Sequence, residues 1–520
     1  MRPGRRTLRR RPGRVRAASS RWPRAVLALS VVGLAATSCA SAAHAAPKDP
    51  AYLAVRIRPP APTTSVLAGS PAGLAVGVAE QVFAAAPVVV VVDARDPADL
   101  PIAATRAERA HAPLLLTSPT ARAPSGGAAI QAAIRALHAR AALAVGMTPR
   151  ALAAQLPGVR VTAVPSRLPV TRAPAPLRHV VLLVHQGAPP SVETAVAVTA
   201  QVAGAQVIAV RGYDPRADPA AITALASARP RQVLAVGAGF GPAGLLAARV
   251  AVAETGVQLP GGGQLVVPMH RLVALYGNPG TPSLGALGEQ GLYASIARAR
   301  QMAAPYRPLS RVPVVPTFEI IATVAQGSPG PNGLYSYETP LSVLRPWVRA
   351  ASRARMYVVL DLQPGRANLL AQAKVYQTLL ERPNVGLALD PEWALGPGQL
   401  PLRQIGSVSI REVNSVINWL AALTARHHLP QKLLVLHQFR LSMIQGEQRL
   451  NTRHDDLAIV IHMDGQGTPG DKQQTWDSVT AAAPPGVFFG WKNFFVKDHP
   501  MLTPQETMAH VPQPVMISYQ

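Results

Sequence analysis

The segment Val385–Trp393, with the sequence VGLALDPEW, decides how the C-terminal half of the 520-residue chain folds. It is a short apolar run that ends in two carboxylates, as expected of a buried strand leading into a polar loop. Side chains alternate across a strand, so the small and acidic residues share one face and the larger apolar residues share the other. We expect Val385, Leu387 and Leu389 to face helices, and Gly386, Ala388, Asp390 and Glu392 to point into a barrel.

Seven further apolar runs extend this pattern over residues 266–520, with helical stretches between them. Eight strands that alternate with helices within about 250 residues have the size and order of a β/α barrel of the TIM type. An open doubly wound sheet is the alternative, and the barrel is favoured because the eighth strand could pair with the first. The predicted strands are 271–276, 314–323, 356–361, 385–390, 433–437, 458–463, 486–490 and 515–519. The predicted helices are 287–302, 341–352, 367–380, 410–426 and 503–510.

An internal repeat precedes the barrel. Three apolar runs recur at nearly one spacing, which indicates a duplicated unit, and continuous apolar runs are typical of parallel strands buried on both faces. The sequence therefore predicts two βαβ-type α/β units over residues 81–265, and Pro260–Gly263 marks their boundary with the barrel. The paired runs are Val88–Asp93 with Val180–His185, Ala112–Thr117 with Ala205–Val210, and Ala141–Gly146 with Gln232–Gly237, at offsets of 92, 93 and 91 residues.

The first of these units resembles the cell wall binding repeat of Gram-positive surface proteins. The resemblance lies in Asp96–Pro101, DPADLP, and in Ala112–Thr117, APLLLT. It implies attachment to cell wall polysaccharide or peptidoglycan. The second unit lacks the DPADLP phrase at the matching place, and a generic α/β spacer is the alternative reading of both units.

Residues 1–46 have the order of a secretory signal peptide, because a basic stretch is followed by the apolar run Ala25–Ala36 and then by small residues. The apolar run is shorter than the roughly 20 residues that span a bilayer. Cys39, in the phrase ATSC, resembles the lipid-bearing cysteine of a bacterial lipoprotein box, which implies membrane attachment through a lipid. Cleavage at Ala43–Ala45 is the alternative. Either way the protein is expected to be exported, to the cell envelope or the extracellular space.

Residues 47–80 mix Pro, Ala and Gly and are interpreted as a linker. The chain has 48% apolar and 15% charged residues, which excludes a disordered protein. Of the formal net charge of +25, the arginines of residues 1–24 supply 10, which leaves 25 − 10 = +15 as scattered arginine. Nucleic acid is therefore not predicted as a partner, whereas anionic envelope polymers are.

In a barrel of this kind the reacting groups lie at the carboxyl ends of the strands. Polar and aromatic residues stand at most of these ends, and Glu319 lies within the second strand. We predict Glu392, Asp390 and Asp361 as catalytic residues, although Asp361 could instead cap a following helix. We predict Glu319, Trp393, His437, Gln438, Asp464, Trp491, Lys492 and Tyr519 as substrate-binding residues, the aromatic ones by stacking on sugar rings.

Other chemistries receive less support. His437, His462 and Asp464 could ligate a metal, but their spacing matches no metal motif, so neither a metal nor another cofactor is predicted. Lys492 could form a Schiff base if it were buried, and an ion pair with Asp464 or Glu392 is the favoured alternative.

Two carboxylates in one cavity repel each other, so the pKa of one rises and that group stays protonated, as glycosidic cleavage requires. Leu389–Trp393 resembles the acid motif of barrel glycosidases, including family 18 chitinases and family 25 lysozymes. The resemblance implies Glu392 as general acid and Asp390 as its electrostatic or orienting partner. The further upstream acid of the chitinase pattern is absent, because Gly386 and Ala388 occupy those places.

Residues 270–520 as a whole resemble the C-terminal half of uncharacterised actinobacterial secreted lipoproteins that also carry the cell wall binding repeat. The phrases that carry this resemblance are Tyr357–Arg366, Leu436–Arg440 and Met463–Gly467. It implies architecture and location but no activity. Two functions therefore stay open: a glycoside hydrolase of the cell envelope, and a non-catalytic wall-binding scaffold with a ligand-binding barrel.

Overall fold

The computed structural model describes residues 52–117 and 125–520. The predicted signal peptide and Cys39 lie outside these residues. Within them, no helix combines the length and the apolar character that crossing a membrane requires.

The N-terminal region contains two four-stranded parallel sheets. In each sheet the strands that the sequence pairs occupy corresponding places, because β5 and β10 are central, β6 and β11 lie on one side, and β7 and β12 on the other. One sheet has the order β6 (Leu114–Thr117), β5 (Val88–Asp93), β7 (Ala141–Val145) and β8 (Arg160–Thr162). The other has the order β11 (Gln206–Val210), β10 (Val180–His185), β12 (Gln232–Val236) and β3 (Thr63–Leu67).

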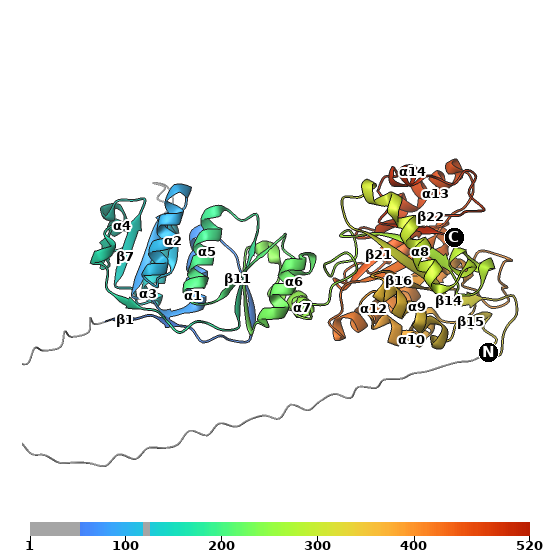
Figure 1. The fold of residues 1–520 in the computed structure, drawn as a ribbon, viewed down its shortest axis with the longest axis horizontal. Helices are drawn as coiled ribbons and strands as arrows, with labels where there is room; N and C mark the ends of the chain where they lie inside the picture. Colours follow the sequence, from blue (N-terminus) through green and yellow to red (C-terminus); the bar gives the residue numbers. More distant parts are fainter. Residues whose placement is uncertain (1–51, 118–124) are drawn as a thin grey trace, which may run out of the picture. The chain divides into compact units, whose positions relative to one another are not determined.

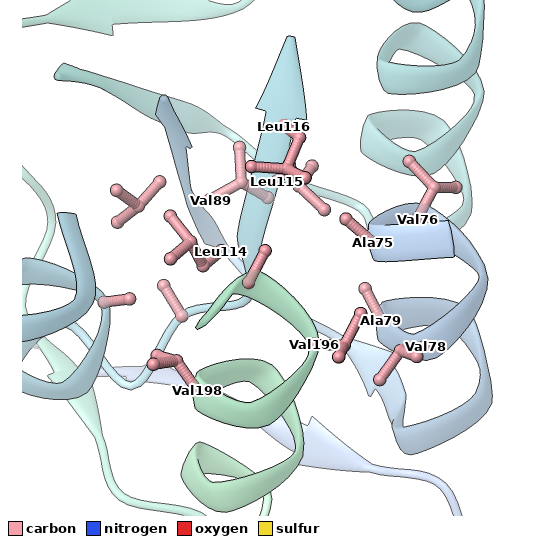
Figure 2. Close-up of a cluster of buried hydrophobic side chains, with 14 of the residues drawn as sticks. Ala75, Val76, Val78, Ala79, Val89, Leu114, Leu115, Leu116, Val196 and Val198 are labelled. Atoms are coloured by element: carbon pink, nitrogen blue, oxygen red, sulfur yellow. The ribbon is translucent and has the colours of Figure 1, made fainter. Parts of the chain in front are cut away.

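Helices pack these sheets into an apolar core. Helices α1 (Pro71–Val82) and α5 (Pro190–Val202) lie side by side (Figure 1). Figure 2 shows their small apolar side chains meeting β5 and β6, at Ala75, Val76, Val78, Ala79, Val196 and Val198 against Val89, Leu114, Leu115 and Leu116. The other helices of this region are α2 (Leu100–Arg109), α3 (Ser125–Ala136), α4 (Pro149–Gln155), α6 (Pro219–Ala228) and α7 (Ala243–Ala253).

The interpretation of residues 47–80 as a linker is wrong for the part that the structure describes. Strand β3 completes the second sheet by pairing with β12, and α1 follows it directly. Ser70 caps α1 by accepting a hydrogen bond from the Gly73 amide at 3.2 Å, with Pro71 at the first helical position. The small residues that suggested a spacer instead allow a helix to pack closely against β-strands and α5.

Residues 271–519 form the predicted closed barrel of eight parallel strands, because β23 pairs with β13 and β13 pairs with β14. The open sheet is therefore excluded. Each predicted strand is present, and β15 (Ser336–Glu338) adds an antiparallel strand to β14. The barrel strands are β13 (Arg271–Gly277), β14 (Val314–Ala325), β16 (Tyr357–Leu362), β17 (Val385–Leu389), β19 (Lys432–Gln438), β21 (Leu457–Met463), β22 (Phe488–Asn493) and β23 (Met516–Tyr519).

Helices surround these strands (Figure 1). The predicted helices are present with shifts at their ends. The helix α13, which follows β21, was not predicted. Its start is a capping box between Thr468 and Asp471, and Trp476 and Val479 are among its few buried residues. The helices are α8 (Leu292–Ala303), α9 (Leu341–Arg353), α10 (Leu369–Val375), α11 (Gln377–Leu380), α12 (Ile410–Arg426), α13 (Pro469–Ala482) and α14 (Pro504–Met508).

The two faces of β17 lie as the alternation of its residues predicts. Val385, Leu387 and Leu389 pack with the helices in one core, whereas Ala388 packs inside the barrel with residues of the other strands. Gly386 also faces inward, because a β-carbon there would lie 2.6 Å from the Leu433 carbonyl oxygen and 3.1 Å from the Tyr357 hydroxyl. Only glycine fits this approach, and it lets the interior close beneath the acidic residues.

Candidate functional site

A cavity of about 260 Å³ lies at the carboxyl ends of the barrel strands. Two carboxylates, two lysines, three glutamines and several aromatic side chains line it. Aromatic side chains combined with a few polar groups are typical of small-molecule sites. The lining side chains are Tyr276, Gln363, Glu392, Trp393, Leu402, Phe439, Asp464, Gln466, Lys492, Phe494, Lys497 and Gln520.

Below these groups, His437 of β19 contacts carboxylates of β14 and β16 and that of Asp464, which directly follows β21. Its Nε2 lies 3.1 Å from Glu319 Oε1 and 3.8 Å from Asp361 Oδ1, and its Nδ1 lies 3.2 Å from Asp464 Oδ2. All four residues are buried. Burial acts to lower the pKa of His437, but the contacts with Asp464 and Glu319 outweigh it and hold that pKa well above its usual range. His437 is therefore a positively charged imidazolium that forms ion pairs with Glu319 and Asp464.

The same contacts keep Glu319 and Asp464 ionised. Burial alone would raise the pKa of each, but hydrogen bonding with His437 and its positive charge lower both pKa values below the usual range. Asp361 differs, because burial raises its pKa more than the charge of His437 lowers it. Its Oδ2 accepts a hydrogen bond from the Tyr276 hydroxyl at 2.9 Å. Asp361 does not cap a helix, since Asn368 caps α10.

Asp390 and Glu392 leave the end of β17 in a short 3₁₀ turn, Pro391–Trp393. Burial, followed by the charge of Glu392, raises the pKa of Asp390 well above its usual range. Burial, followed by the charge of Asp464, raises the pKa of Glu392 to about 7. At neutral pH Asp390 is therefore protonated and Glu392 is about half protonated, whereas Asp464 is an anion in the same cavity. These are the states of an acid and of a carboxylate base or nucleophile.

The loop after β17 fixes the backbone of Glu392. The Gly406 amide donates a hydrogen bond to the Glu392 carbonyl oxygen at 2.7 Å. A β-carbon at Gly406 would lie 2.6 Å from that oxygen and 2.2 Å from the carbonyl oxygen of Ala394. The glycine therefore allows the loop to close against the acidic turn and hold Glu392 at the cavity wall.

His462 and Lys492 complete the inner layer. The ring of His462 stacks on that of His437 at 5.2 Å, and its Nε2 lies 2.8 Å from Ser518 Oγ. Burial lowers the pKa of His462 to about 4, so this ring is neutral beside the charged one. Lys492 Nζ lies 3.7 Å from the centre of the Tyr276 ring and 3.9 Å from Asp464 Oδ2.

Several buried polar atoms here have no hydrogen-bond partner among the described residues. Buried polar groups are nearly always hydrogen-bonded, so these atoms are free to bind water or a polar ligand. The atoms are Glu319 Oε2, Asp361 Oδ1, Asp390 Oδ1, Asp464 Oδ1 and Trp393 Nε1. Among all residues that the structure describes, no group of three or more His, Cys, Asp or Glu side chains is arranged to hold a metal ion.

Three predicted binding residues lie on the outer face of the barrel and not in the cavity. Trp491 packs with Trp476 and Met463, and its Nε1 donates to Asn493 Oδ1 at 2.8 Å. The Tyr519 hydroxyl contacts the Tyr306 hydroxyl at 2.6 Å, and Gln438 donates to Glu447 Oε2 at 2.8 Å. These predictions are wrong because each residue stands one position from an inward-facing one, and neighbours in a strand face opposite sides.

The same alternation locates residues that the sequence reading missed. Counting two residues onward from an inward-facing position reaches Gln363 from Asp361, Phe439 from His437 and Phe494 from Lys492. Likewise Gln520 follows Ser518. Tyr276 is the last residue of the first predicted strand and could have been found in this way. Leu402, Gln466 and Lys497 belong to loops, and no periodic signal indicates them.

Of the remaining predicted residues, Glu392, Trp393, Asp464 and Lys492 line the cavity, while Glu319, Asp361, Asp390 and His437 are buried in the layer beneath. Comparisons of the chain with known protein families, curated proteins and solved structures gave no match. The geometry of the cavity is therefore the basis for a functional conclusion.

Proposed function

We propose that this protein is an exported glycoside hydrolase of the cell envelope, acting on a wall or extracellular polysaccharide. The observation that carries the proposal is that two carboxyl groups in one cavity differ in protonation. Burial raises the pKa of Glu392 to about 7, whereas His437 keeps Asp464 ionised. Glycosidic cleavage requires one acid and one carboxylate across the bond that breaks.

In this scheme Glu392 donates its proton to the glycosidic oxygen as the bond from the anomeric carbon to that oxygen breaks. The Asp464 carboxylate either attacks the anomeric carbon or takes a proton from the attacking water. Water supplies the hydroxyl group of the new reducing end, and one proton returns to Glu392. The charge of Glu392 raises the pKa of Asp390, so Asp390 stays protonated beside the acid. Asp361 belongs to the layer that holds His437 and Tyr276.

Aromatic side chains support a sugar as ligand. Trp393, Phe439 and Phe494 line the cavity beside amide and carboxyl groups, so a sugar ring could stack on an aromatic face while its hydroxyls form hydrogen bonds. Trp393 therefore keeps its predicted role of stacking on a sugar ring. Phe439 and Phe494 take the role that was predicted for Trp491 and Tyr519.

The test of catalysis is release of reducing ends from peptidoglycan, arabinogalactan and α-glucans by residues 47–520. Glu392→Gln should lower the rate by about 10²- to 10⁴-fold, the usual contribution of a general acid. Glu412→Gln, on α12 outside the cavity, is a matched control and should cleave normally. Equal cleavage by wild type and Glu392→Gln would contradict the proposal. Binding without cleavage by either would favour the non-catalytic scaffold.

We propose further that residues 81–265 attach the protein to the wall. The phrase Asp96–Pro101, which resembles the cell wall binding repeat, follows the central strand β5, where Asp96 caps a short 3₁₀ turn by accepting from the Ala98 amide at 3.0 Å. Purified walls should sediment residues 47–520 and the Glu392→Gln variant equally, because the acid in the barrel takes no part in attachment. If neither protein sediments, attachment to the wall is contradicted.

Attachment of a lipid to Cys39 is a separate proposal. In an expressing bacterium, labelled fatty acid should enter the full-length chain and should be absent from a Cys39→Ala variant. Label in both proteins, or in neither, would favour cleavage at Ala43–Ala45 and release as a soluble protein.

A further inference from the structure

Lys492 is a buried cation that faces the cavity. It lies on the inner face of β22, its side chain is 4% exposed, and it lines the cavity. Among the described residues its Nζ makes no hydrogen bond, and the nearest carboxylate oxygen, Asp464 Oδ2, is 3.9 Å away. An ammonium group taken out of water is costly unless acceptors replace the water. The three N–H donors of Lys492 are therefore available to a ligand.

Aromatic rings lie beside the Lys492 side chain. Its Nζ lies 3.7 Å from the centre of the Tyr276 ring and 5.2 Å from that of Phe494, and aromatic faces attract cations. Asp464 adds an opposite charge. These contacts hold the Lys492 side chain at the cavity wall, where its Nζ can bind an anion.

A nearby lysine provides an internal comparison. Lys472 is also buried, but its Nζ donates to the Lys492 carbonyl oxygen at 2.7 Å and forms an ion pair with Asp498. Its charge is therefore offset within the protein. Lys492 has no such close partner, although it lies on the same side of the barrel.

The cavity mouth adds a second cation and neutral donors. Lys497 is exposed and lines the same cavity, as do the amides of Gln363, Gln466 and Gln520. The carboxylates that line the cavity are Glu392 and Asp464, and the second already contacts His437. A ligand with a negative charge would offset the charge of Lys492 by a charge-assisted hydrogen bond, which a neutral hydroxyl does only in part.

We propose that the cavity binds a sugar that carries an anionic group, a carboxylate or a phosphate, through Lys492 Nζ with Lys497 at the rim. This rests on the proposed function in taking the ligand to be a sugar. The carboxylate case corresponds to a uronic acid, and the phosphate case to a phosphorylated sugar. An anionic envelope polymer would supply either group.

The test is calorimetric titration of residues 47–520 at constant ionic strength with glucose, galactose and mannose, with their uronates, and with their 6-phosphates. At least one anionic sugar should bind about ten- to hundredfold more tightly than its neutral parent, the difference that one charge-assisted hydrogen bond makes. A preference for uronates or for phosphates identifies the anionic group.

Lys492→Met should remove this preference, Lys492→Arg should keep part of it, and Lys497→Met should weaken it. Lys497 is exposed, so its variant remains informative if Lys492→Met folds poorly. Lys374→Met, an exposed lysine of α10, is the matched control and should bind as wild type does. Equal binding of neutral and anionic sugars, no binding by the whole panel, or a preference that survives both Lys492→Met and Lys497→Met would overturn the proposal.

This result and the test of catalysis can fail separately. If uronates bind through Lys492 but no polymer is cleaved, recognition of an anionic sugar stands and hydrolysis does not. If Glu392-dependent cleavage occurs while neutral and anionic sugars bind alike, hydrolysis stands and this inference does not.

Discussion

The open sheets of the N-terminal region and the closed barrel use the same parallel strands, yet they treat polar side chains differently. At the end of β5, Asp93 pairs with Arg95, two residues along the chain, in an exposed ion pair. At the end of β19, His437 contacts Glu319, 118 residues away, and both are buried. Closing a sheet makes its inner face converge, so distant polar residues meet in one small volume.

The central strand β5 of the first open sheet, by contrast, is packed on both faces. Val88–Val92 of β5 are all buried in the apolar core of this region. Similar apolar strand runs therefore have different consequences: β5 contributes to an apolar core, and the barrel strands carry a layer of charged groups at one end.

The largest expected difference between the two regions is in stability, when a core side chain of the first sheet is removed. Leu115→Ala removes a fully buried side chain (Figure 2) and should lower the free energy of unfolding of the N-terminal region by about 2–5 kcal/mol. Hydrogen exchange measured by mass spectrometry should accelerate in β5 and β6 and stay unchanged in β19, because the two cores contain different residues.

Ile102→Ala, at a half-exposed position of α2, is the control and should change the free energy of unfolding by less than about 0.5 kcal/mol. Faster exchange in β19 of the Leu115→Ala variant would mean that the sheets and the barrel unfold together.

The next effect concerns only the barrel, where a carboxyl group titrates near neutrality. Because Glu392 must be protonated to act and its pKa is about 7, kcat/KM should fall about tenfold per pH unit above that value, and about hundredfold by two units above it. The acidic limb should reflect Asp464, whose lowered pKa keeps it ionised as the pH falls.

A pH–rate profile on the cleaved polymer measures both limbs. Replacing Glu392 by Gln should leave a slow residual rate without the alkaline limb. An alkaline limb that persists in this variant would assign the titration to another group and remove Glu392 from the mechanism.

A smaller effect is expected at the opposite end of the barrel, where Lys432 begins β19. Its Nζ donates to the carbonyl oxygens of Arg382 and Val385 at 2.8 and 2.9 Å, and burial lowers its pKa to about 7. Between that value and the usual lysine pKa, the unfolded chain binds a proton that the folded chain has released. Stability should therefore rise with pH from about 7 to about 10, by up to about 1.4 kcal/mol per unit.

Urea unfolding at several pH values checks this expectation. Lys432→Met should flatten the slope by that amount, whereas Lys374→Met should keep it. Equal slopes in all three proteins would mean that Lys432 stays charged through its two carbonyl acceptors.

The eight barrel strands could be predicted because each is a buried apolar run, and the inward direction of Asp390 followed from alternation along β17. The wrong and missing predictions have three physical origins. Trp491, Tyr519 and Gln438 have suitable side chains at strand ends, but the alternation of side chains places them on the outer face of the barrel. The helix α1 was missed because small residues that pack closely have the same composition as a linker. Leu402 and Lys497 lie on loops, whose course depends on tertiary contacts that no local pattern encodes.

The smallest expected effect tests the division between the two faces of the last strand. Tyr519 packs outside the barrel against Tyr306, while Ser518 faces inward to His462. Tyr519→Phe removes one buried hydrogen bond and should lower the free energy of unfolding by about 1 kcal/mol, with sugar binding unchanged. Tyr293→Phe, on the exposed surface of α8, should change neither quantity. Weaker sugar binding by Tyr519→Phe at unchanged stability would place Tyr519 at the ligand after all, and would mean that the outer face of β23 contributes to the site.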